Sequence, residues 1–249
     1  MRPLDAPEAP PPRAPLPGVT SCCRRAGGGC AHRARAAPAP SAAPWYPSVV
    51  LTDEQIAPET LRPLRRSDYD RMVELGLFED ERVELLHGML VAMSPQDALH
   101  AEVIGRLNRR LVPALLGRAV VRVQAPLAVS DESEPEPDVA VVPEGDYSAG
   151  HPQTALLVVE VAGSSLKKDR GVKARLYAAA GIPEYWLVDL ERRVVEVRTR
   201  PTARRYGRLR TKRLGDTITL VELPGVALRI ADFLPPDGTT RRRRGSRRR

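Results

Sequence analysis

Cysteine is missing from most of this 249-residue chain, because Cys22, Cys23 and Cys30 all lie near its start. A disulfide framework for the remainder is therefore excluded. Together with His32, these cysteines offer four potential zinc ligands. The adjacent pair lacks the C-x₂₋₄-C spacing of zinc sites, however, so we favour an unstructured segment over a zinc site.

Long apolar runs are also missing. No stretch of about 18 consecutive apolar residues occurs, and the N-terminus has no continuous apolar segment of the signal-peptide type. Membrane insertion and secretion therefore have no support, and we expect a cytoplasmic protein with no membrane partner. Aromatic residues are scarce at 4%, but the 42% of hydrophobic residues are enough for one or two folded domains.

The central part of the chain has no excess of positive charge. The formal net charge is +8, but residues 1–44 carry six Arg against two acidic residues, and residues 241–249 carry seven Arg. Residues 45–240 hold the other 26 Lys and Arg against 29 Asp and Glu. Because this part is slightly acidic, overall electrostatic attraction cannot bring it to a polyanion. Any binding of a polyanion must therefore depend on a local site.

Composition divides the chain into three parts. Residues 1–44 contain 10 Pro and 11 Ala without a hydrophobic period, which predicts a disordered tail rich in Ala, Pro and Arg. Residues 236–249 include the run RRRRGSRRR and predict a basic disordered tail. We favour a solvated state for this tail over a non-specific nucleic-acid anchor. The folded domain is expected over residues 45–235.

Hydrophobic patterns within this domain alternate between helix and strand signals. A capping pattern predicts a short helix over residues 67–75, and apolar runs around His87-Gly88 predict a hairpin. Leucines four residues apart indicate an amphipathic helix over 97–117, and a second helix is expected over 168–180. Strands are expected at 120–129, 137–142, 155–162, 184–190, 194–200, 205–214 and 217–223, the last two as a pair. This order indicates an α/β fold with a mixed central sheet flanked by helices.

The tetrapeptide VVEV occurs twice, at 158–161 and at 194–197, with its glutamate in different surroundings. Glu160 has apolar neighbours on both faces of its strand, which predicts a buried side chain. The strand of Glu196 leads outward to charge, so we expect Glu196 to be solvated. A buried ionised carboxylate is strongly unfavourable unless a cation, a base or a raised pKa compensates it. We therefore expect a cation near Glu160, with an ordinary ion pair to a helix residue as the structural alternative.

Asp138 and Lys173 are candidates to join Glu160. If strands 137–142 and 155–162 pair, the two carboxylates converge at one end of the sheet, and such hard oxygen ligands suit Mg²⁺ or Mn²⁺. Lys173 lies in a helix that returns over the sheet toward Glu160, where an ammonium group could orient water and stabilise charge on a phosphoryl oxygen. The alternatives are a turn aspartate and a surface pair between Asp169 and Lys173.

Glu84 and His100 are further candidates with open assignments. Glu84 lies in the first strand of the predicted hairpin and is either a fourth acidic member of the site or an outward-facing residue. His100 lies in the first turn of the long helix. We favour a solvated surface residue there over a phosphate contact or a proton carrier.

Six sequence blocks in order resemble the Uma-two family, whose members are described as restriction endonucleases and which belongs to the PD-(D/E)XK nuclease-like superfamily. The blocks are E-L-L-H-G-M-L at 84–90, M-S-P at 93–95 followed by His100, E-P-D at 136–138, L-V-V-E-V at 157–161, D-R-G-V-K at 169–173 and L-Y-A-A-A-G-I-P-E-Y-W-L-V-D at 176–189. The resemblance covers roughly residues 60–235, and the succession is more specific than any single block.

The resemblance implies a restriction-endonuclease-like core and hydrolysis of DNA phosphodiester bonds that depends on Mg²⁺ or Mn²⁺. It further implies that Asp138 and Glu160 bind the metal, with the main-chain carbonyl of Val161 as another ligand. Lys173 would be the positive catalytic residue, and Glu84 an accessory acidic residue. The chain departs from the superfamily pattern at Ala162, where the E-x-K element has its lysine; relatives of this kind supply the lysine from the following helix.

Two other functions remain as alternatives. One is a catalytically inactive nuclease fold that serves as a DNA-binding or interaction module. The other is metal-dependent hydrolysis of a different phosphodiester, such as RNA or a nucleotide. Nucleotide-driven motors, dinucleotide enzymes and zinc peptidases are disfavoured, because the chain has no Walker loop, no G-x-G-x-x-G and no H-E-x-x-H. Cleavage of both strands of a duplex would favour a homodimer, but no heptad pattern indicates one.

Overall fold

The computed structural model describes residues 62–236. The predicted tail over residues 1–44, with its cysteines, lies outside the described residues, as does all but the first residue of the tail predicted over 236–249. None of the described helices combines the length and the apolar character that a membrane span requires.

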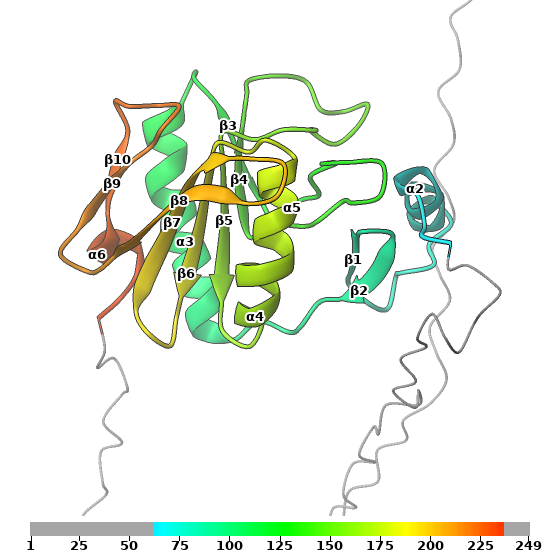
Figure 1. Ribbon diagram of the computed structural model, residues 1–249, viewed down its shortest axis with the longest axis horizontal. Coiled ribbons are helices and arrows are strands. Elements are labelled where there is room, and N and C mark those ends of the chain that lie inside the picture. The colour runs from blue at the N-terminus through cyan, green and yellow to red at the C-terminus, as the bar shows by residue number, and fades with distance from the viewer. Residues whose placement is uncertain (1–61, 237–249) are drawn as a thin grey trace, which may run out of the picture. The chain divides into compact units, whose positions relative to one another are not determined.

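Helices and strands alternate through the described part of the chain (Figure 1). In order, the main elements are α2 (Arg66–Glu74), β1 (Val83–Leu86), β2 (Met89–Ala92), α3 (Ala98–Leu115), β3 (Val120–Val123), β4 (Val139–Val142), β5 (Leu157–Ala162), α4 (Leu166–Lys168), a π-helical turn (Asp169–Lys173), α5 (Ala174–Ala179), β6 (Glu184–Asp189), β7 (Val194–Pro201), β8 (Tyr206–Lys212), β9 (Thr217–Thr219), β10 (Ala227–Arg229) and α6 (Ile230–Phe233).

The central sheet contains six strands in the order β3-β4-β5-β6-β7-β8. Strands β5 and β6 run parallel, and the other neighbouring pairs run antiparallel. Parallel neighbours need a crossover connection, which α4, the π-helical turn and α5 provide. The predicted α/β fold with a mixed sheet is confirmed.

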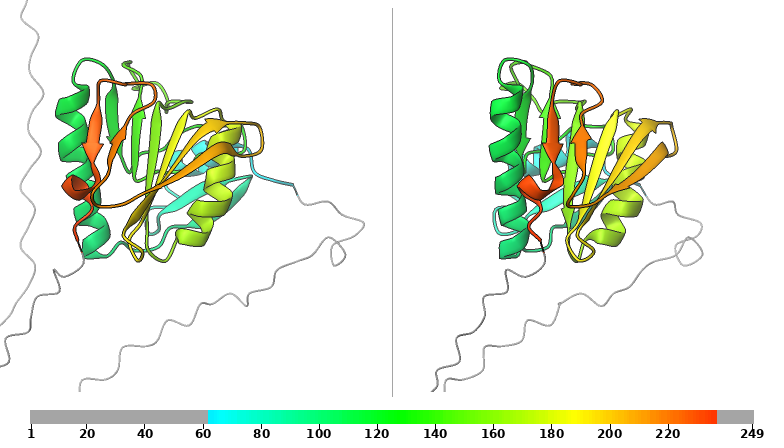
Figure 2. Two further views of the ribbon diagram at one scale, coloured as in Figure 1. Left: turned by 60° about the vertical axis from the view of Figure 1, so that its left-hand side comes forward. Right: turned by 90° about the vertical axis from the view of Figure 1, so that its left-hand side faces the viewer.

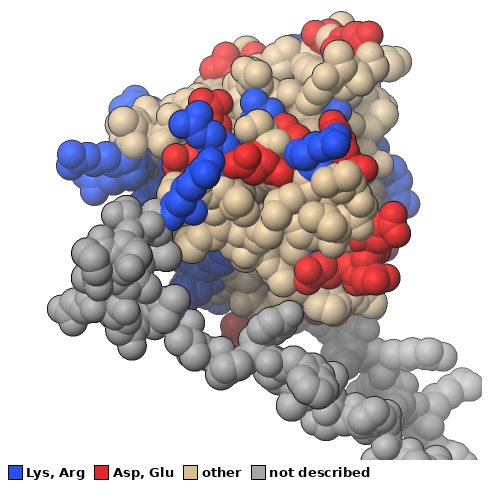
Figure 3. Space-filling view, turned by 90° about the vertical axis from the view of Figure 1, so that its right-hand side faces the viewer, with Lys and Arg blue, Asp and Glu red and all other residues tan. Residues whose placement is uncertain are grey.

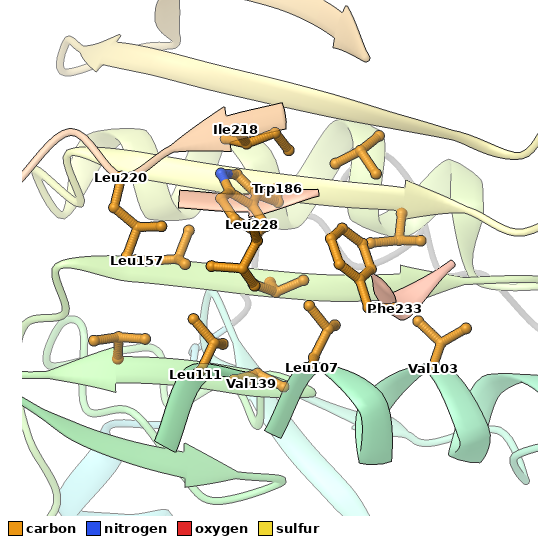
Figure 4. Close-up of a cluster of buried hydrophobic side chains, with 14 of the residues drawn as sticks. Val103, Leu107, Leu111, Val139, Leu157, Trp186, Ile218, Leu220, Leu228 and Phe233 are labelled. Carbon is orange, nitrogen blue, oxygen red and sulfur yellow. The ribbon is translucent and has the colours of Figure 1, made fainter. Parts of the chain in front are cut away.

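Helix α3 covers one face of this sheet, as its sequence pattern predicts. The helix begins after Asp97, whose Oδ1 accepts a hydrogen bond from the backbone N–H of His100 at 2.8 Å. Its leucines pack with the aromatic pair Trp186 and Phe233 and with apolar residues of β9 and β10 (Figure 4). The β9–β10 hairpin therefore lies on the same side of the sheet as α3 (Figure 2).

The opposite face of the sheet packs against α5. Tyr177 and Ala174 of this helix are buried against Val158 and Tyr185 of the two parallel strands. Gly181 follows the helix with φ 74°, a conformation that glycine adopts readily at the end of a helix. The crossover helix therefore packs against the two parallel strands that it connects.

The hairpin formed by β1 and β2 is confirmed. His87 and Gly88 have φ 50° and 75°, which is the geometry of a two-residue type I′ turn. A Cβ at Gly88 would lie 2.2 Å from the Cβ of Pro63, so only glycine fits there. Leu85 and Glu134 exchange two backbone hydrogen bonds, which join the hairpin to the segment that precedes β4.

Three details differ from the sequence prediction. The strand expected over 120–129 ends at Val123, because Gln124 takes φ 50° and leaves the extended conformation. The short first helix begins at Arg66, and Asp68 rather than Ser67 accepts the capping hydrogen bond from the backbone of Arg65. The predicted pairing of 205–214 with 217–223 is wrong. There β8 pairs with β7, whereas β9 pairs with β10, a strand too short to show a hydrophobic pattern.

Glu134 makes folding stability depend on pH. Its side chain is 3% exposed, and burial raises the pKa of Glu134 to about 7, with a contribution from Asp70. A folded-state pKa above the unfolded value favours the protonated folded protein, so stability is lost as pH rises from about 4.5 through 7. We expect Glu134→Gln to remove this loss, which amounts to about 3 kcal/mol at pH 8. Urea unfolding of both proteins at pH 5 and pH 8 measures the difference; an equal stability change with pH in the two proteins would contradict the assignment.

Candidate functional site

A cavity of about 310 Å³ lies at the C-terminal end of β5. The segment after β2, the first turn of α3, the residues before β4 and the turn from β5 into α4 all contribute to its wall. Its polar lining residues are Ser94, Gln96, Asp97, His100, Glu136, Asp138, Glu160, Ser164, Ser165, Lys168, Asp169 and Lys173. Four separate segments thus bring titratable groups to one place.

Strand register brings Asp138 and Glu160 together. In the antiparallel pairing of β4 with β5, Val139 lies opposite Val159, so the next residue outward on β4 lies opposite Glu160. That residue is Asp138. The side chains of directly opposite residues start about 5 Å apart. Asp138 is 8% exposed and Glu160 4% exposed, and both line the cavity.

Each of these carboxylates has one oxygen engaged by the protein. Oδ2 of Asp138 accepts from the backbone N–H of Val161 at 2.7 Å and lies 3.2 Å from Nε2 of His100. Oε1 of Glu160 accepts from Nζ of Lys173 at 2.9 Å and from the hydroxyl of Tyr177 at 2.7 Å. Within residues 62–236, the other oxygen of each carboxylate has no protein partner. These two oxygens are available to a ligand in the cavity.

Lys173 links Glu160 to the buried Glu84. Its Nζ lies 2.9 Å from Oε1 of Glu160 and 2.8 Å from Oε2 of Glu84, and the lysine side chain is 3% exposed. Nζ of Lys168 donates to the other oxygen of Glu84 at 2.7 Å. Of the two interpretations of Glu84, the structure therefore selects a buried member of this cluster. The surface pair considered for Lys173 is wrong, because both Asp169 and Lys173 are buried.

The π-helical turn explains how two lysines reach the same glutamate. An α-helix turns by 100° per residue, so residues five apart point in different directions. The wider turn of the π-helix, which closes i to i+5 hydrogen bonds, places Lys168 and Lys173 on one side. Such turns recur at functional sites in helices. The hydrophobic period of the sequence gives no sign of this turn, which is why Lys168 was missed.

Burial and neighbouring charge shift the pKa values of these groups. Burial raises the pKa of Glu160 to about 8, although the ammonium of Lys173 acts in the opposite direction. Burial alone would lower the pKa of Lys173, but Glu160 and Glu84 hold it above its ordinary value. Burial also favours the neutral form of Glu84, yet the two lysines lower its pKa overall. Lys173 is therefore charged, while Glu160 is the acid least compensated by its surroundings.

The charges of the cluster fit a divalent cation. Glu84, Asp138, Glu160 and Asp169 lie close enough to influence one another, and only two lysine ammonium groups oppose them. When all four carboxyl groups are ionised, two negative charges remain, and a bound dication would neutralise them and favour the ionised form of Glu160. Carboxylate oxygens are also the ligands that Mg²⁺ and Mn²⁺ prefer. In the described part of the chain, no three His, Cys, Asp or Glu side chains converge on a single ion, so main-chain oxygens or water would have to complete its coordination.

The structure corrects the expected positions of His100 and Glu196. The side chain of His100 is only 13% exposed and contacts Asp138, so it is part of the cavity wall rather than a solvated residue. Burial acts to lower the pKa of His100, but the hydrogen bond to Asp138 raises it overall. Glu196 is 7% exposed because Arg170 and Arg198 bind its carboxylate. The expectation that Glu196 is solvated is wrong. Arg198 is a neighbour on the same strand, but Arg170 reaches Glu196 from the crossover helix, a tertiary contact that the strand pattern does not show.

Two predicted features of the E-x-K segment have different outcomes. Ala162 is buried on the same face as Val158, and the lysine at Glu160 comes from the crossover helix instead. The amide of Val161 donates to Asp138, whereas the role of its carbonyl as a metal ligand stays a prediction.

Tyr177 was missed, because a tyrosine in an apolar helix pattern looks like an ordinary core residue.

Comparison with known proteins places this chain in a family. None of the curated proteins with which the chain was compared matches it. A solved structure from Anabaena variabilis, titled as a putative nuclease belonging to DUF820, resembles the chain with a TM-score of 0.56 and 12% identity, over 69% of this chain and 98% of that chain. The model of a family described as "Uma2: Putative restriction endonuclease" matches residues 66–231, which include every candidate site residue. The chain belongs to the Uma2 family and has the fold of that solved structure.

Proposed function

We propose that this protein is an endodeoxyribonuclease that hydrolyses DNA phosphodiester bonds in the cavity at the end of β5 with the help of Mg²⁺ or Mn²⁺. One observation carries the proposal. Asp138 and Glu160 lie opposite each other on paired strands and line the same cavity beside Lys173, and within residues 62–236 each has one carboxylate oxygen without a protein partner.

Asp138 and Glu160 would hold the cation, with the carbonyl of Val161 as a further ligand implied by the family. When bound, a divalent cation supplies Lewis-acid activation of the scissile phosphate and lowers the pKa of water. The protein keeps both carboxylates in place for this purpose. The amide of Val161 and the ring of His100 fix Asp138, and Tyr177 and Lys173 fix Glu160.

One N–H donor of the Lys173 ammonium group remains for the reaction. An ammonium group has three N–H donors, and Glu84 and Glu160 account for two of them. The third can bind the attacking water or a phosphoryl oxygen and stabilise negative charge that develops there. Glu84 supports this role by keeping the buried ammonium charged and in position.

A phosphodiester substrate suits the charges at the entrance. Lys168 lines the cavity and its side chain is 28% exposed, so it offers a cation to an approaching phosphate. On the face that carries α2, acidic and basic side chains are interspersed (Figure 3), as expected for a protein that recognises its substrate through a local site. The family description supports DNA as the nucleic acid.

Cleavage of supercoiled plasmid tests the proposal. We expect the purified chain to convert the plasmid to nicked or linear form with Mg²⁺ or Mn²⁺, and we expect excess chelator to stop the reaction. A copurifying nuclease is excluded if Glu160→Gln protein, purified in parallel, is inactive. Equal cleavage with and without chelator would contradict metal dependence. A folded wild-type chain that cleaves no DNA with either metal would favour the catalytically inactive module instead.

A further inference from the structure

A second cavity, separate from the candidate nuclease site, lies between β8 and β9. Its volume is about 240 Å³. Arg208, Arg210 and Lys212 of β8 line one side, and Thr217 and Thr219 of β9 line another. The cavity thus combines cationic side chains and hydroxyl groups, which are both common partners of phosphate oxygens.

The three cations have no acidic partner. Among the described residues, no carboxylate oxygen lies within 4.0 Å of Arg208, Arg210 or Lys212. The only carboxylate that lines this cavity is that of Glu184. Its two oxygens accept hydrogen bonds from Trp186 Nε1 and from the backbone N–H of Val221, both at distances below 3 Å. The positive groups are therefore free to bind a ligand that is not part of the described chain.

Their spacing follows the strand. Arg208, Arg210 and Lys212 lie opposite Thr199, Val197 and Val195 of β7, so all three belong to one face of the sheet. Alternate strand residues are about 6.6 Å apart, so the row spans about 13 Å. One strand of DNA carries a phosphate every 3.4 Å or so along its axis, so the row faces several consecutive phosphates. A single small anion would leave most of the row unused.

The sheet edge argues against a second copy of the chain as the ligand. Strand β8 is the last strand of the sheet, with Arg208 and Arg210 exposed. Pairing of two copies along this edge would bring their cations together, and charged residues on edge strands prevent such pairing. A polyanion neutralises the same charges.

We propose that the row formed by Arg208, Arg210 and Lys212 is a second DNA-binding surface, which holds the phosphate backbone of a duplex outside the segment in the nuclease site. The proposal rests on the proposed function for its choice of DNA. Lys212 lies directly across the sheet from Val161, three strands away, which corresponds to about 14 Å. The row therefore contributes to affinity, whereas the reacting groups lie elsewhere.

A triple variant, compared with a control variant of equal net charge, tests this surface. Binding of a 40-base-pair duplex to the full chain is measured by fluorescence anisotropy in chelator at several salt concentrations. For Arg208→Gln/Arg210→Gln/Lys212→Gln we expect the affinity at 0.1 M salt to fall about 10- to 100-fold and the salt slope to fall by about three. The control removes three exposed arginines outside the cavity, Arg109→Gln/Arg118→Gln/Arg175→Gln, and changes the net charge equally.

The outcomes separate this proposal from the nuclease proposal. Selective loss of duplex affinity in the row variant supports the surface, even if no variant or wild type cleaves DNA. In an active enzyme, KM for long DNA should rise while kcat stays within about two-fold. Equal loss in the row variant and the control would mean that total charge alone matters and would overturn the proposal. Unchanged affinity in a row variant that remains folded by circular dichroism would also overturn it.

Discussion

Asp138→Asn is expected to reduce Mg²⁺-dependent DNA cleavage by about 10³-fold or more while the protein stays folded. The substitution keeps the shape of the side chain but removes the negative charge that an ion needs. The amide can still offer its oxygen to the N–H of Val161, so the local hydrogen bond survives. Single-turnover cleavage of a labelled duplex measures the effect, and circular dichroism checks the fold.

Asp146→Asn is the matched control for this variant. Asp146 follows β4, as Asp138 precedes it, but its carboxylate is exposed and accepts from the neighbouring backbone N–H of Ser148. We expect the control to cleave DNA at the wild-type rate. Cleavage by Asp138→Asn at more than about one tenth of that rate would remove Asp138 from the metal site.

Lys173→Met is expected to lower the free energy of unfolding by about 3–5 kcal/mol. The loss comes from the two carboxylates of Glu84 and Glu160, which would remain buried without the ammonium between them. Methionine fits the space of the lysine stem, so packing changes little. Urea unfolding at pH 7 measures the effect, and the exposed neighbour Lys167→Met serves as control with an expected change below about 0.5 kcal/mol.

A double variant separates lost charge pairing from lost packing. Adding Glu160→Gln to Lys173→Met removes one of the two buried carboxylates that have lost the ammonium. The double variant should regain a large part of the lost stability, without any return of cleavage. If Lys173→Met is as stable as Lys167→Met, the ammonium does not lie between Glu84 and Glu160. If the double variant is less stable than Lys173→Met alone, the pairing is not the source of the effect.

The sequence predicts the framework of this fold because local patterns determine it. The leucines of α3 recur every four residues, and Leu107, Leu111 and Leu115 are part of the core. The turn at His87-Gly88 needs positive φ at both residues, and the glycine makes this turn visible in the sequence. Glu160 could be identified as a buried carboxylate because apolar residues surround it on both faces of its strand.

Tertiary contacts determine what the sequence could not predict. His100 lies at the start of an exposed helix turn, and its burial depends on Asp138, 38 residues later. Arg170, which belongs to the crossover helix, binds the carboxylate of Glu196. Lys168 joins the site only because the helix widens into a π-helical turn, which no hydrophobic period reveals. The glutamates of the two VVEV segments are thus both buried, although their flanking residues indicate burial only for Glu160.

Calorimetric titration with Mn²⁺, in the absence of DNA, tests most directly whether Asp138 and Glu160 share one ion. We expect one Mn²⁺ to bind the wild-type chain and the Asp146→Asn control, and we expect Asp138→Asn and Glu160→Gln to lose this binding although both remain folded. Wild-type binding by either of these two variants, or a wild-type chain that cleaves DNA in a metal-dependent way but binds its ion elsewhere, would contradict the account.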